Sequence, residues 1–128
     1  MIVDSSAVES IFLRRKGYER LIDTLASASQ AGVGAPTLAE ASLDLAMATG
    51  QDVHPLLARF LQEFELAIVP FSDAHYRVAA DAFRRYGKGR HEAGLDFGDC
   101  LAYATARLSG QPLLVDDQRF EATDLTLA

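Results

Sequence analysis

Four acidic positions follow short apolar runs or open expected helices, and their type and spacing point to metal chemistry. They are Asp4 after residues 1–3, Glu40 after 33–36, Asp99 within 96–100, and Asp116 with Asp117 after 113–115. If the runs are parallel strands, each carboxylate lies at a carboxyl end, where open α/β sheets place their ligand crevice. Clustered carboxylates there are a site for hard divalent cations such as Mg²⁺, which support phosphodiester hydrolysis.

Each acid also has an ordinary structural explanation. Asp4 precedes two serines and could belong to a strand-to-helix turn, and Glu40 completes a capping-box pattern that begins at Thr37. Asp99 could be a first-turn acid favoured by the helix dipole, with Asp96 as the cap. The joint pattern favours metal binding, because gathered acids repel one another unless a cation or a proton compensates.

The elements that must position these acids alternate between short apolar runs and helical patterns, which is typical of βαβ units and a mainly parallel sheet. The expected strands are residues 2–4, 33–35, 66–69 and 113–115, with 125–127 as a further candidate. Apolar residues recur at helical spacing from Val53 to Phe64, with Asp52 as the expected N-cap. Further helices are expected before Gly17, over 21–28, from Ser72 to Tyr86, and from Asp96 to Gly110.

The length and composition predict one compact domain spanning residues 1–128, and the alternation of strands and helices predicts that it is α/β. The formal charge of -6 and the pI near 4.9 argue against non-specific affinity for nucleic acid or anionic membranes. The single cysteine, Cys100, is expected to be a small buried residue, and one cysteine fits a reducing cytoplasm. Neither a leader peptide nor an apolar run long enough to span a membrane is apparent.

One basic segment stands out in this acidic chain. Arg84, Arg85, Lys88, Arg90 and His91 fall in a ten-residue window without an acid, and the window also contains Tyr86. Such a cluster could contact RNA phosphates, with the tyrosine ring stacking on an unpaired base. The alternative is a solvated helix end, where cations meet the helix dipole favourably.

Several motifs resemble the PIN-domain ribonucleases, and specifically the VapC-type toxins of toxin–antitoxin pairs. They are IVDSSA at 2–7, PTLAEAS at 36–42, RYGKGRH at 85–91, GLDFGDC at 94–100, QPLL at 111–114 and FEATD at 120–124. The resemblance covers nearly the whole chain. It implies a PIN-like three-layer sandwich, whose sheet of four or five strands has an order of about 3-2-1-4-5.

The resemblance also implies an endoribonuclease in which Asp4, Glu40 and Asp99 bind Mg²⁺ or Mn²⁺ and water is the nucleophile. The fourth acid departs from the pattern. Related toxins commonly carry Gly-Asp-Asp-Phe or Gly-Asn-Asp-Phe where this chain has Asp-Gln-Arg-Phe at 117–120. Asp117, three residues before the aromatic, is the preferred fourth ligand. Hydrogen-bonding or additional roles are expected for the remaining polar neighbours, which are Ser6, Asp96 and Asp116.

Two other functions remain open from the sequence alone. A phosphoryl-transfer enzyme of similar fold is disfavoured, because Asp4 is not followed by a second Asp two residues later. A non-catalytic module with the PIN fold stays possible because of the altered fourth acid. By resemblance, the expected partners are RNA, a VapB-type antitoxin that delivers an Arg to the acids, and a second copy of the chain in a homodimer.

Overall fold

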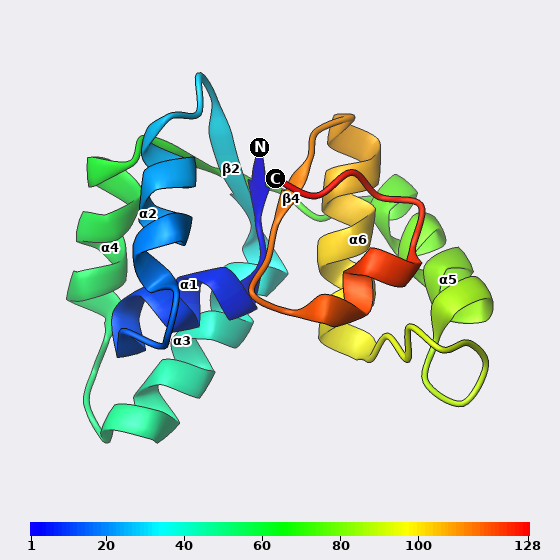
Figure 1. Ribbon diagram of the computed structural model, residues 1–128, viewed down its shortest axis with the longest axis horizontal. Coiled ribbons are helices and arrows are strands. Elements are labelled where there is room, and N and C mark those ends of the chain that lie inside the picture. The colour runs from blue at the N-terminus through cyan, green and yellow to red at the C-terminus, as the bar shows by residue number, and fades with distance from the viewer.

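A four-stranded parallel sheet forms the centre of the protein in a computed structural model that describes residues 1–128 (Figure 1). The strand order is β3-β2-β1-β4. The strands are β1 (Ile2–Val3), β2 (Ala31–Gly34), β3 (Leu66–Val69) and β4 (Leu113–Leu114). Ile2 and Val3 pair with Leu113 and Leu114, and Ile2 also pairs with Gly32. The expected parallel sheet and its order are therefore confirmed for the first four strands.

Helices cover both faces of this sheet. They are α1 (Ser5–Leu13), α2 (Tyr18–Ala26), α3 (Ala35–Thr49), α4 (His54–Glu63), α5 (Asp73–Tyr86) and α6 (Phe97–Ser109), followed by the 3-10 helix η1 (Gln118–Ala122). In Figure 1 the first four helices lie on one side of the strands, and α5, α6 and η1 lie on the other. The molecule is thus a three-layer α/β sandwich, as expected.

Each face of the sheet has its own apolar core. Val3 and Leu114 point into the core beneath α1 to α4, whereas Ile2 and Leu113 point into the core beneath α5 and α6. This division follows from the strand geometry, since successive side chains leave a strand on opposite faces. Phe120 of η1 is fully buried in the second core and fixes the segment after β4.

Three local expectations were wrong. Helix α3 begins at Ala35 with Gly34 as its N-cap, so Thr37 lies inside the helix, and its buried hydroxyl has no hydrogen-bond partner. The N-cap of α4 is Val53, although Asp52 still accepts a hydrogen bond from the backbone N–H of His54. Residues 125–127 form no strand, because only one isolated bridge joins Leu127 to Leu113.

Other caps agree with the sequence. Ser72 begins α5 in a capping box closed by the side chain of His75. Helix α6 begins after Asp96 and ends at Gly110, whose left-handed backbone (φ 63°) suits glycine. Cys100 is buried, as expected, and burial raises the pKa of its thiol to about 11. No helix is both long and apolar enough to cross a membrane.

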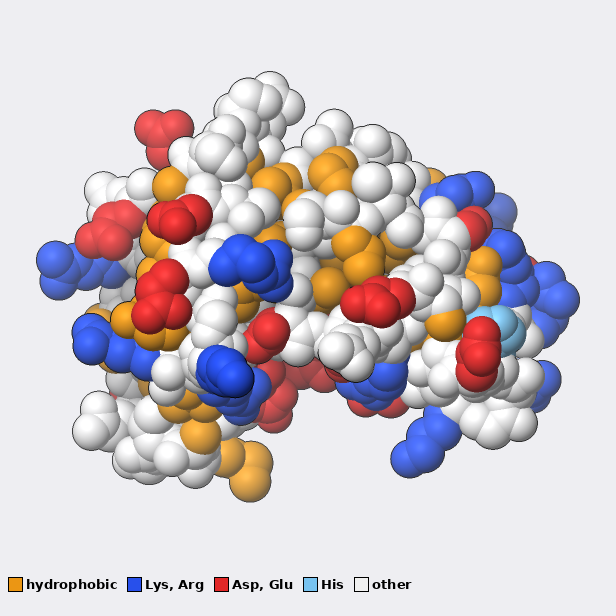
Figure 2. Space-filling model, in the orientation of Figure 1, with side chains coloured by type: hydrophobic (Ala, Val, Ile, Leu, Met, Phe, Trp, Pro, Cys, Tyr) orange, Lys and Arg blue, Asp and Glu red, His pale blue; other side chains and the backbone are white.

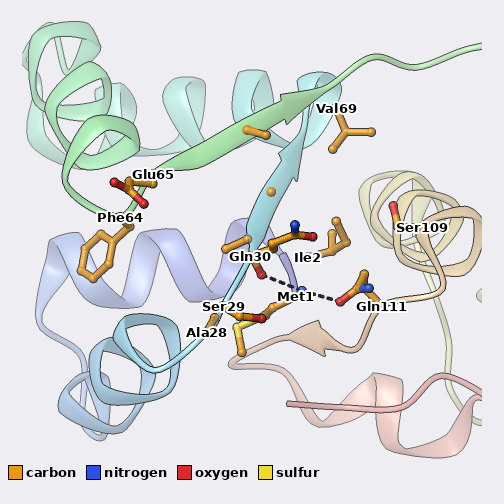
Figure 3. Close-up of a pocket in the computed structure, with 13 residues that line it drawn as sticks. Met1, Ile2, Ala28, Ser29, Gln30, Phe64, Glu65, Val69, Ser109 and Gln111 are labelled. Atoms are coloured by element: carbon orange, nitrogen blue, oxygen red, sulfur yellow. Dashed lines mark hydrogen bonds between the residues drawn. The ribbon is translucent and has the colours of Figure 1, made fainter.

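The parallel strands all begin on one side of the sheet, here called the amino-terminal edge, and all end on the opposite side, here called the carboxyl edge. These two sides differ in chemistry. At the amino-terminal edge, the Met1 ammonium donates hydrogen bonds to the backbone oxygen of Gln30 (3.0 Å) and the side chain of Gln111 (2.9 Å), beside a hollow lined by one acid, Glu65 (Figure 3). At the opposite edge, acidic side chains gather around the notch between the two halves of the molecule (Figure 2). The candidate chemistry therefore belongs to the carboxyl edge.

Candidate metal centre

Asp4 lies directly after β1 and serves as the N-cap of α1. Its Oδ2 accepts hydrogen bonds from the Ser6 backbone N–H (3.0 Å) and the Ser6 hydroxyl (2.6 Å). The residue is only 3% exposed, and burial raises the pKa of its carboxyl despite these two bonds. No Lys, Arg or His forms an ion pair with Asp4, so its charge is not compensated within the chain.

Glu40 enters the same region from the second turn of α3. Burial raises its pKa, the charge of Asp4 adds to this effect, and a hydrogen bond from Ser5 opposes it. Its carboxylate rests against Gly98 of α6, where a Cβ atom would lie 2.1 Å from Oε2 of Glu40. Only glycine therefore leaves room for this carboxylate in its present position.

Asp96 and Asp99 form a capping box at the start of α6. The Asp99 N–H donates to Oδ1 of Asp96, and the Asp96 N–H donates to Oδ2 of Asp99, both at 2.9 Å. Burial, together with the charge of Asp96, raises the pKa of Asp99 to about 7. Burial acts in the same direction on Asp96, but hydrogen bonds from Asp99 and the charge of Arg119 hold the pKa of Asp96 below its usual value. Asp96, the expected cap, and Asp99, the expected metal ligand, are thus joined by two reciprocal hydrogen bonds.

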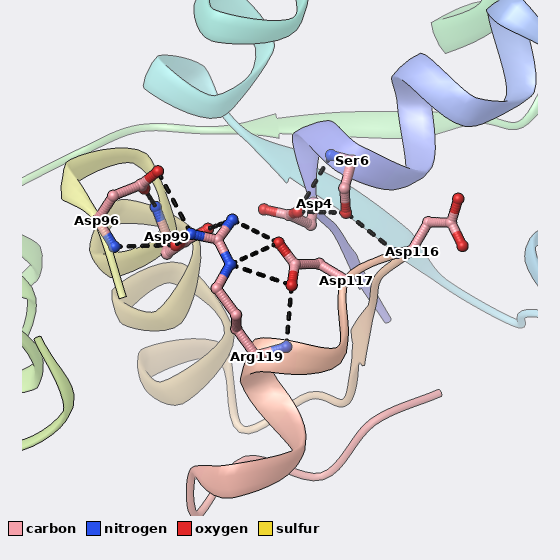
Figure 4. A network of polar contacts seen from close by, with 7 residues as sticks. All are labelled: Asp4, Ser6, Asp96, Asp99, Asp116, Asp117 and Arg119. Atoms are coloured by element: carbon pink, nitrogen blue, oxygen red, sulfur yellow. Dashed lines mark hydrogen bonds and ion pairs between the residues drawn. The ribbon is translucent and has the colours of Figure 1, made fainter. Parts of the chain in front are cut away.

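The two acids after β4 point in different directions (Figure 4). Asp116 turns away to the hydroxyl of Ser10 on α1, while its backbone N–H donates to the Ser6 hydroxyl at 3.0 Å. Asp117 faces the other acids and is the N-cap of η1. Ser6 therefore connects Asp4 to the β4 segment, and Asp117 is the acid that this segment presents to the centre.

Arg119 lies among these carboxylates (Figure 4). Its Nε donates to Oδ2 of Asp117 at 2.8 Å, and its Nη1 lies 2.9 Å from Oδ2 of Asp99 and 3.6 Å from Oδ2 of Asp96. Despite burial, the hydrogen bonds from Arg119 lower the pKa of Asp117, and Asp117 in turn raises the pKa of the guanidinium. The arginine is therefore a fixed positive charge inside the acidic cluster.

The donor set suits a hard divalent cation. Carboxylate oxygens are the ligands that Mg²⁺ and Mn²⁺ prefer, and Asp4 and Glu40 are acids without a cationic partner. The absence of a side chain at Gly98 leaves space for the Glu40 carboxylate, which is consistent with Glu40 as a metal ligand. However, no three acidic, His or Cys side chains converge as a preformed metal site. Metal binding therefore requires side-chain rotation, and Asp99 must be shared with or released by Arg119.

The basic segment is only partly free to meet RNA. Arg84 is ion-paired with Asp81 (2.6 Å), and Arg85 lies 3.8 Å from Asp81 and 3.6 Å from Asp124. Lys88 forms no ion pair and is exposed. The charges of the two arginines are thus partly compensated by acids that the ten-residue window did not include.

Tyr86 does not offer a surface for base stacking in this structure. It is 9% exposed, and its ring packs against His91 (5.1 Å between centroids) and Tyr103 (5.9 Å). Arg90 covers the ring of Phe83 at 5.6 Å. The expectation of a stacking tyrosine is corrected, because the helix face that carries Tyr86 packs on α6. Lys88 and Arg90 are exposed cations without an ion pair, whereas Arg84 and Arg85 are exposed and ion-paired.

Comparison with known proteins identifies the family. The model of the PIN domain matches residues 1–125. The chain belongs to the PIN-domain family. It is 40% identical to the ribonuclease VapC36 of Mycobacterium tuberculosis over 126 residues, which cover 98% of this chain and 91% of that protein. This PIN domain therefore stands among the VapC ribonucleases.

Solved structures agree with this placement of the PIN domain. The M. tuberculosis toxin VapC20, described as cleaving the sarcin–ricin loop, superposes with a TM-score of 0.80 at 16% identity, covering 99% of this chain and 97% of that one. VapBC2 of Rickettsia felis, solved with a promoter DNA fragment, gives a TM-score of 0.75 at 17% identity, with 99% and 96% covered. At these identities the likeness supports the fold alone.

Two residues of this centre were not among the predicted site residues. Arg119 was noted only as a departure from the family pattern, although an arginine at a position where relatives have an acid was itself the signal. Gly98 lies inside the GLDFGDC motif, but its contact with Glu40 depends on how α3 crosses α6. No local sequence pattern encodes that crossing.

A second acidic pair beside the centre predicts a pH-dependent stability. Glu9 of α1 lies next to Asp44 of α3, and burial together with Asp44 raises the pKa of Glu9 to about 8. The folded protein therefore keeps a proton on Glu9 that the unfolded chain loses above about pH 4.3, so folding stability falls as the pH rises from there to about 8. We expect Glu9→Gln to raise the free energy of unfolding of the metal-free protein by about 1 kcal/mol at pH 8.5 and by less at pH 5.5.

Urea unfolding at the two pH values measures this effect. Glu92→Gln, in the exposed loop after α5, is the matched control and should leave the pH dependence of the wild type unchanged. An unaltered pH dependence in Glu9→Gln would show that the proton is held elsewhere.

Proposed function

We infer that the chain is an endoribonuclease that cleaves RNA phosphodiester bonds as the toxin of a type II toxin–antitoxin pair, and we propose that it requires Mg²⁺ or Mn²⁺. The observation that supports the proposal is the placement of Asp4 directly after β1, with Glu40 on α3 and Asp99 on α6 nearby at the carboxyl edge of a PIN sheet. The 40% identity to a VapC ribonuclease supports the same reaction. Residues 1–128 would act as a single domain in the cytoplasm, where the RNA substrate lies.

The residues of the centre have distinct roles in this proposal. Asp4, Glu40 and Asp99 would hold the divalent ion, which when bound activates the attacking water and stabilises the leaving oxygen. Ser6 orients the Asp4 carboxylate through its 2.6 Å hydrogen bond. Lys88 and Arg90, on the loop after α5, would contact phosphates on either side of the scissile bond.

The proposed protein partners follow from the same chemistry. The acidic centre already binds one guanidinium, that of Arg119, so an arginine from a VapB-type antitoxin is a ligand of the right kind. A homodimer is proposed because large apolar side chains such as Tyr76 (60% exposed) and Phe97 (79% exposed) lie open on α5 and α6. Co-purification with the product of an adjacent gene and analytical sedimentation test these two partners.

Chelation tests the proposed reaction. Purified protein is incubated with total RNA after EDTA treatment, and Mg²⁺ or Mn²⁺ is then added back while new RNA 5′ ends are sequenced. We expect specific ends only with metal, and none with Asp4→Asn under the same conditions. Equal cleavage in EDTA would contradict metal dependence. Absence of both cleavage and a metal-induced rise in melting temperature would favour the non-catalytic module, which Arg119 in the centre would then explain.

A further inference from the structure

The acidic centre divides into a part with a cation and a part without one. Asp117, Asp99 and Asp96 surround the guanidinium of Arg119, whereas Asp4 and Glu40 accept hydrogen bonds only from serines. Asp99 is ion-paired with Arg119 and directly follows Gly98, which lies against the Glu40 carboxylate. A divalent ion that binds the uncompensated Asp4 and Glu40 would therefore have to share Asp99 with Arg119, after the side-chain rotation that metal binding requires.

The pair of Asp117 and Arg119 is built locally and does not depend on the rest of the centre. Asp117 Oδ1 accepts a hydrogen bond from the backbone N–H of Arg119 at 2.9 Å, and this bond caps η1. Oδ1 and Oδ2 also accept hydrogen bonds from Nε of Arg119, at 3.1 and 2.8 Å. The backbone and the side chain of Arg119 thus both fix the position of the Asp117 carboxylate. Phe120, the next residue, is fully buried and anchors this turn against the core.

Carboxylates lie close to every nitrogen atom of the guanidinium in this arrangement. Nε donates a hydrogen bond to Asp117, and Nη2 is paired with Asp117 and donates to Asp99 at 3.4 Å. Nη1 forms ion pairs with Asp99 and Asp96. A guanidinium has five N–H donors in a fixed plane, and carboxylates surround all three of its nitrogen atoms. Arg119 is therefore bound to carboxylates of its own chain, while 41% of its side chain stays exposed.

We propose that the guanidinium of Arg119 takes the place of a second metal ion, so that this protein binds a single divalent ion at Asp4, Glu40 and Asp99 while Asp117 is held by arginine. A permanent charge at this position neutralises Asp117 and part of the charge of Asp99 without binding from solution. The inference rests on the proposed function only in that the acids bind metal. Its test measures ion binding and needs no cleavage.

Titration calorimetry of the metal-free protein with Mn²⁺ counts the ions. We expect one ion per chain for the wild type and two for Arg119→Gln, because removal of the guanidinium frees Asp117 and Asp99 to bind the second ion. Arg119→Lys, which keeps the charge, should stay at one. Arg107→Gln, which removes an arginine paired with Asp124 outside the centre, should match the wild type.

Asp117→Asn gives a second measurement that does not depend on the folding of Arg119→Gln. If arginine rather than metal holds Asp117, the variant binds one Mn²⁺ with an affinity within about threefold of the wild type, since a change of one hydrogen-bonding partner away from the ion has a small effect. In the Arg119→Gln background, Asp117→Asn should remove the added ion. Circular dichroism confirms that each variant is folded.

Different results separate this inference from the proposed function. Two ions in the wild type, one ion in folded Arg119→Gln, or a more than tenfold loss of affinity in Asp117→Asn would each overturn the role of Arg119 while leaving a metal-dependent enzyme intact. Absence of Mn²⁺ binding in every variant would instead remove the proposed metal dependence and this inference with it.

Discussion

Asp99→Asn is expected to abolish RNA cleavage while leaving the metal-free fold intact. The substitution removes the charge of a proposed metal ligand, which in the metal-free protein is ion-paired with Arg119. Loss of groups that merely orient metal ligands typically lowers activity 10- to 100-fold, so loss of a ligand should lower the cleavage rate by more than about 100-fold. The Asn oxygen can still accept the Asp96 N–H that closes the capping box, so the start of α6 is preserved.

The stability of Asp99→Asn distinguishes a metal ligand from a structural acid. Because burial raises the pKa of Asp99 to about 7, the folded protein at pH 8 carries an ionised, partly desolvated carboxylate that opposes folding. We therefore expect the melting temperature of the metal-free variant at pH 8 to equal or exceed that of the wild type, and its rise on adding Mn²⁺ to be lost. Calorimetry with and without Mn²⁺ measures both.

Asp116→Asn is the matched control for this prediction. It makes the same chemical change in the segment after β4, in an acid that turns to Ser10 rather than to the centre. Cleavage within about threefold of the wild type is expected, as for a substitution outside the reacting groups. Wild-type cleavage by Asp99→Asn, or loss of cleavage in Asp116→Asn, would show that the four acids have been assigned wrongly.

Gly98→Ala is expected to weaken metal binding about 10- to 100-fold without weakening the fold. The new methyl group would lie 2.1 Å from Oε2 of Glu40, and the flexible end of that side chain has to move. The helix itself gains, since alanine favours helix over glycine by up to about 1 kcal/mol. Melting temperature and Mn²⁺ affinity should therefore change in opposite directions or independently, which a general packing defect would not produce.

A double-mutant cycle shows whether Gly98 acts through Glu40. If it does, Gly98→Ala should have little further effect on Mn²⁺ affinity in a Glu40→Gln background, because the displaced group has already been weakened as a ligand. Additive losses would mean that the methyl group disturbs another part of the centre. Calorimetric titration of the four proteins provides the comparison.

The sequence predicts the frame of this centre because the relevant signals are local. Strand-end acids and the Asp96 cap are readable from short patterns, and parallel pairing brings the ends of β1 and β4 together. These signals explain why the fold, its order and the family resemblance were correct. They also explain the error at Thr37, since a capping-box pattern does not report that the helix has already begun at Ala35.

Long-range packing decided what the sequence did not predict. Tyr86 lies in a basic segment, yet α5 turns its ring toward Tyr103 on α6. The contact between Gly98 and Glu40 joins residues 58 positions apart, and its existence depends on the approach of two helices. Arg119 could reach several acids from its place before Phe120, and only the folded turn shows that it lies between Asp117 and Asp99.

Because each face of the sheet has its own apolar core, the acids at the carboxyl edge come from two separately packed halves of the protein. Glu40 belongs to the half that contains α1 to α4, whereas Asp99 belongs to the half that contains α5, α6 and η1. The short strands and the contact between α3 and α6 join the halves. A cation that binds both residues would therefore add a further link between the two halves. Metal binding would then increase both the affinity for the scissile phosphate and the rigidity of the whole domain.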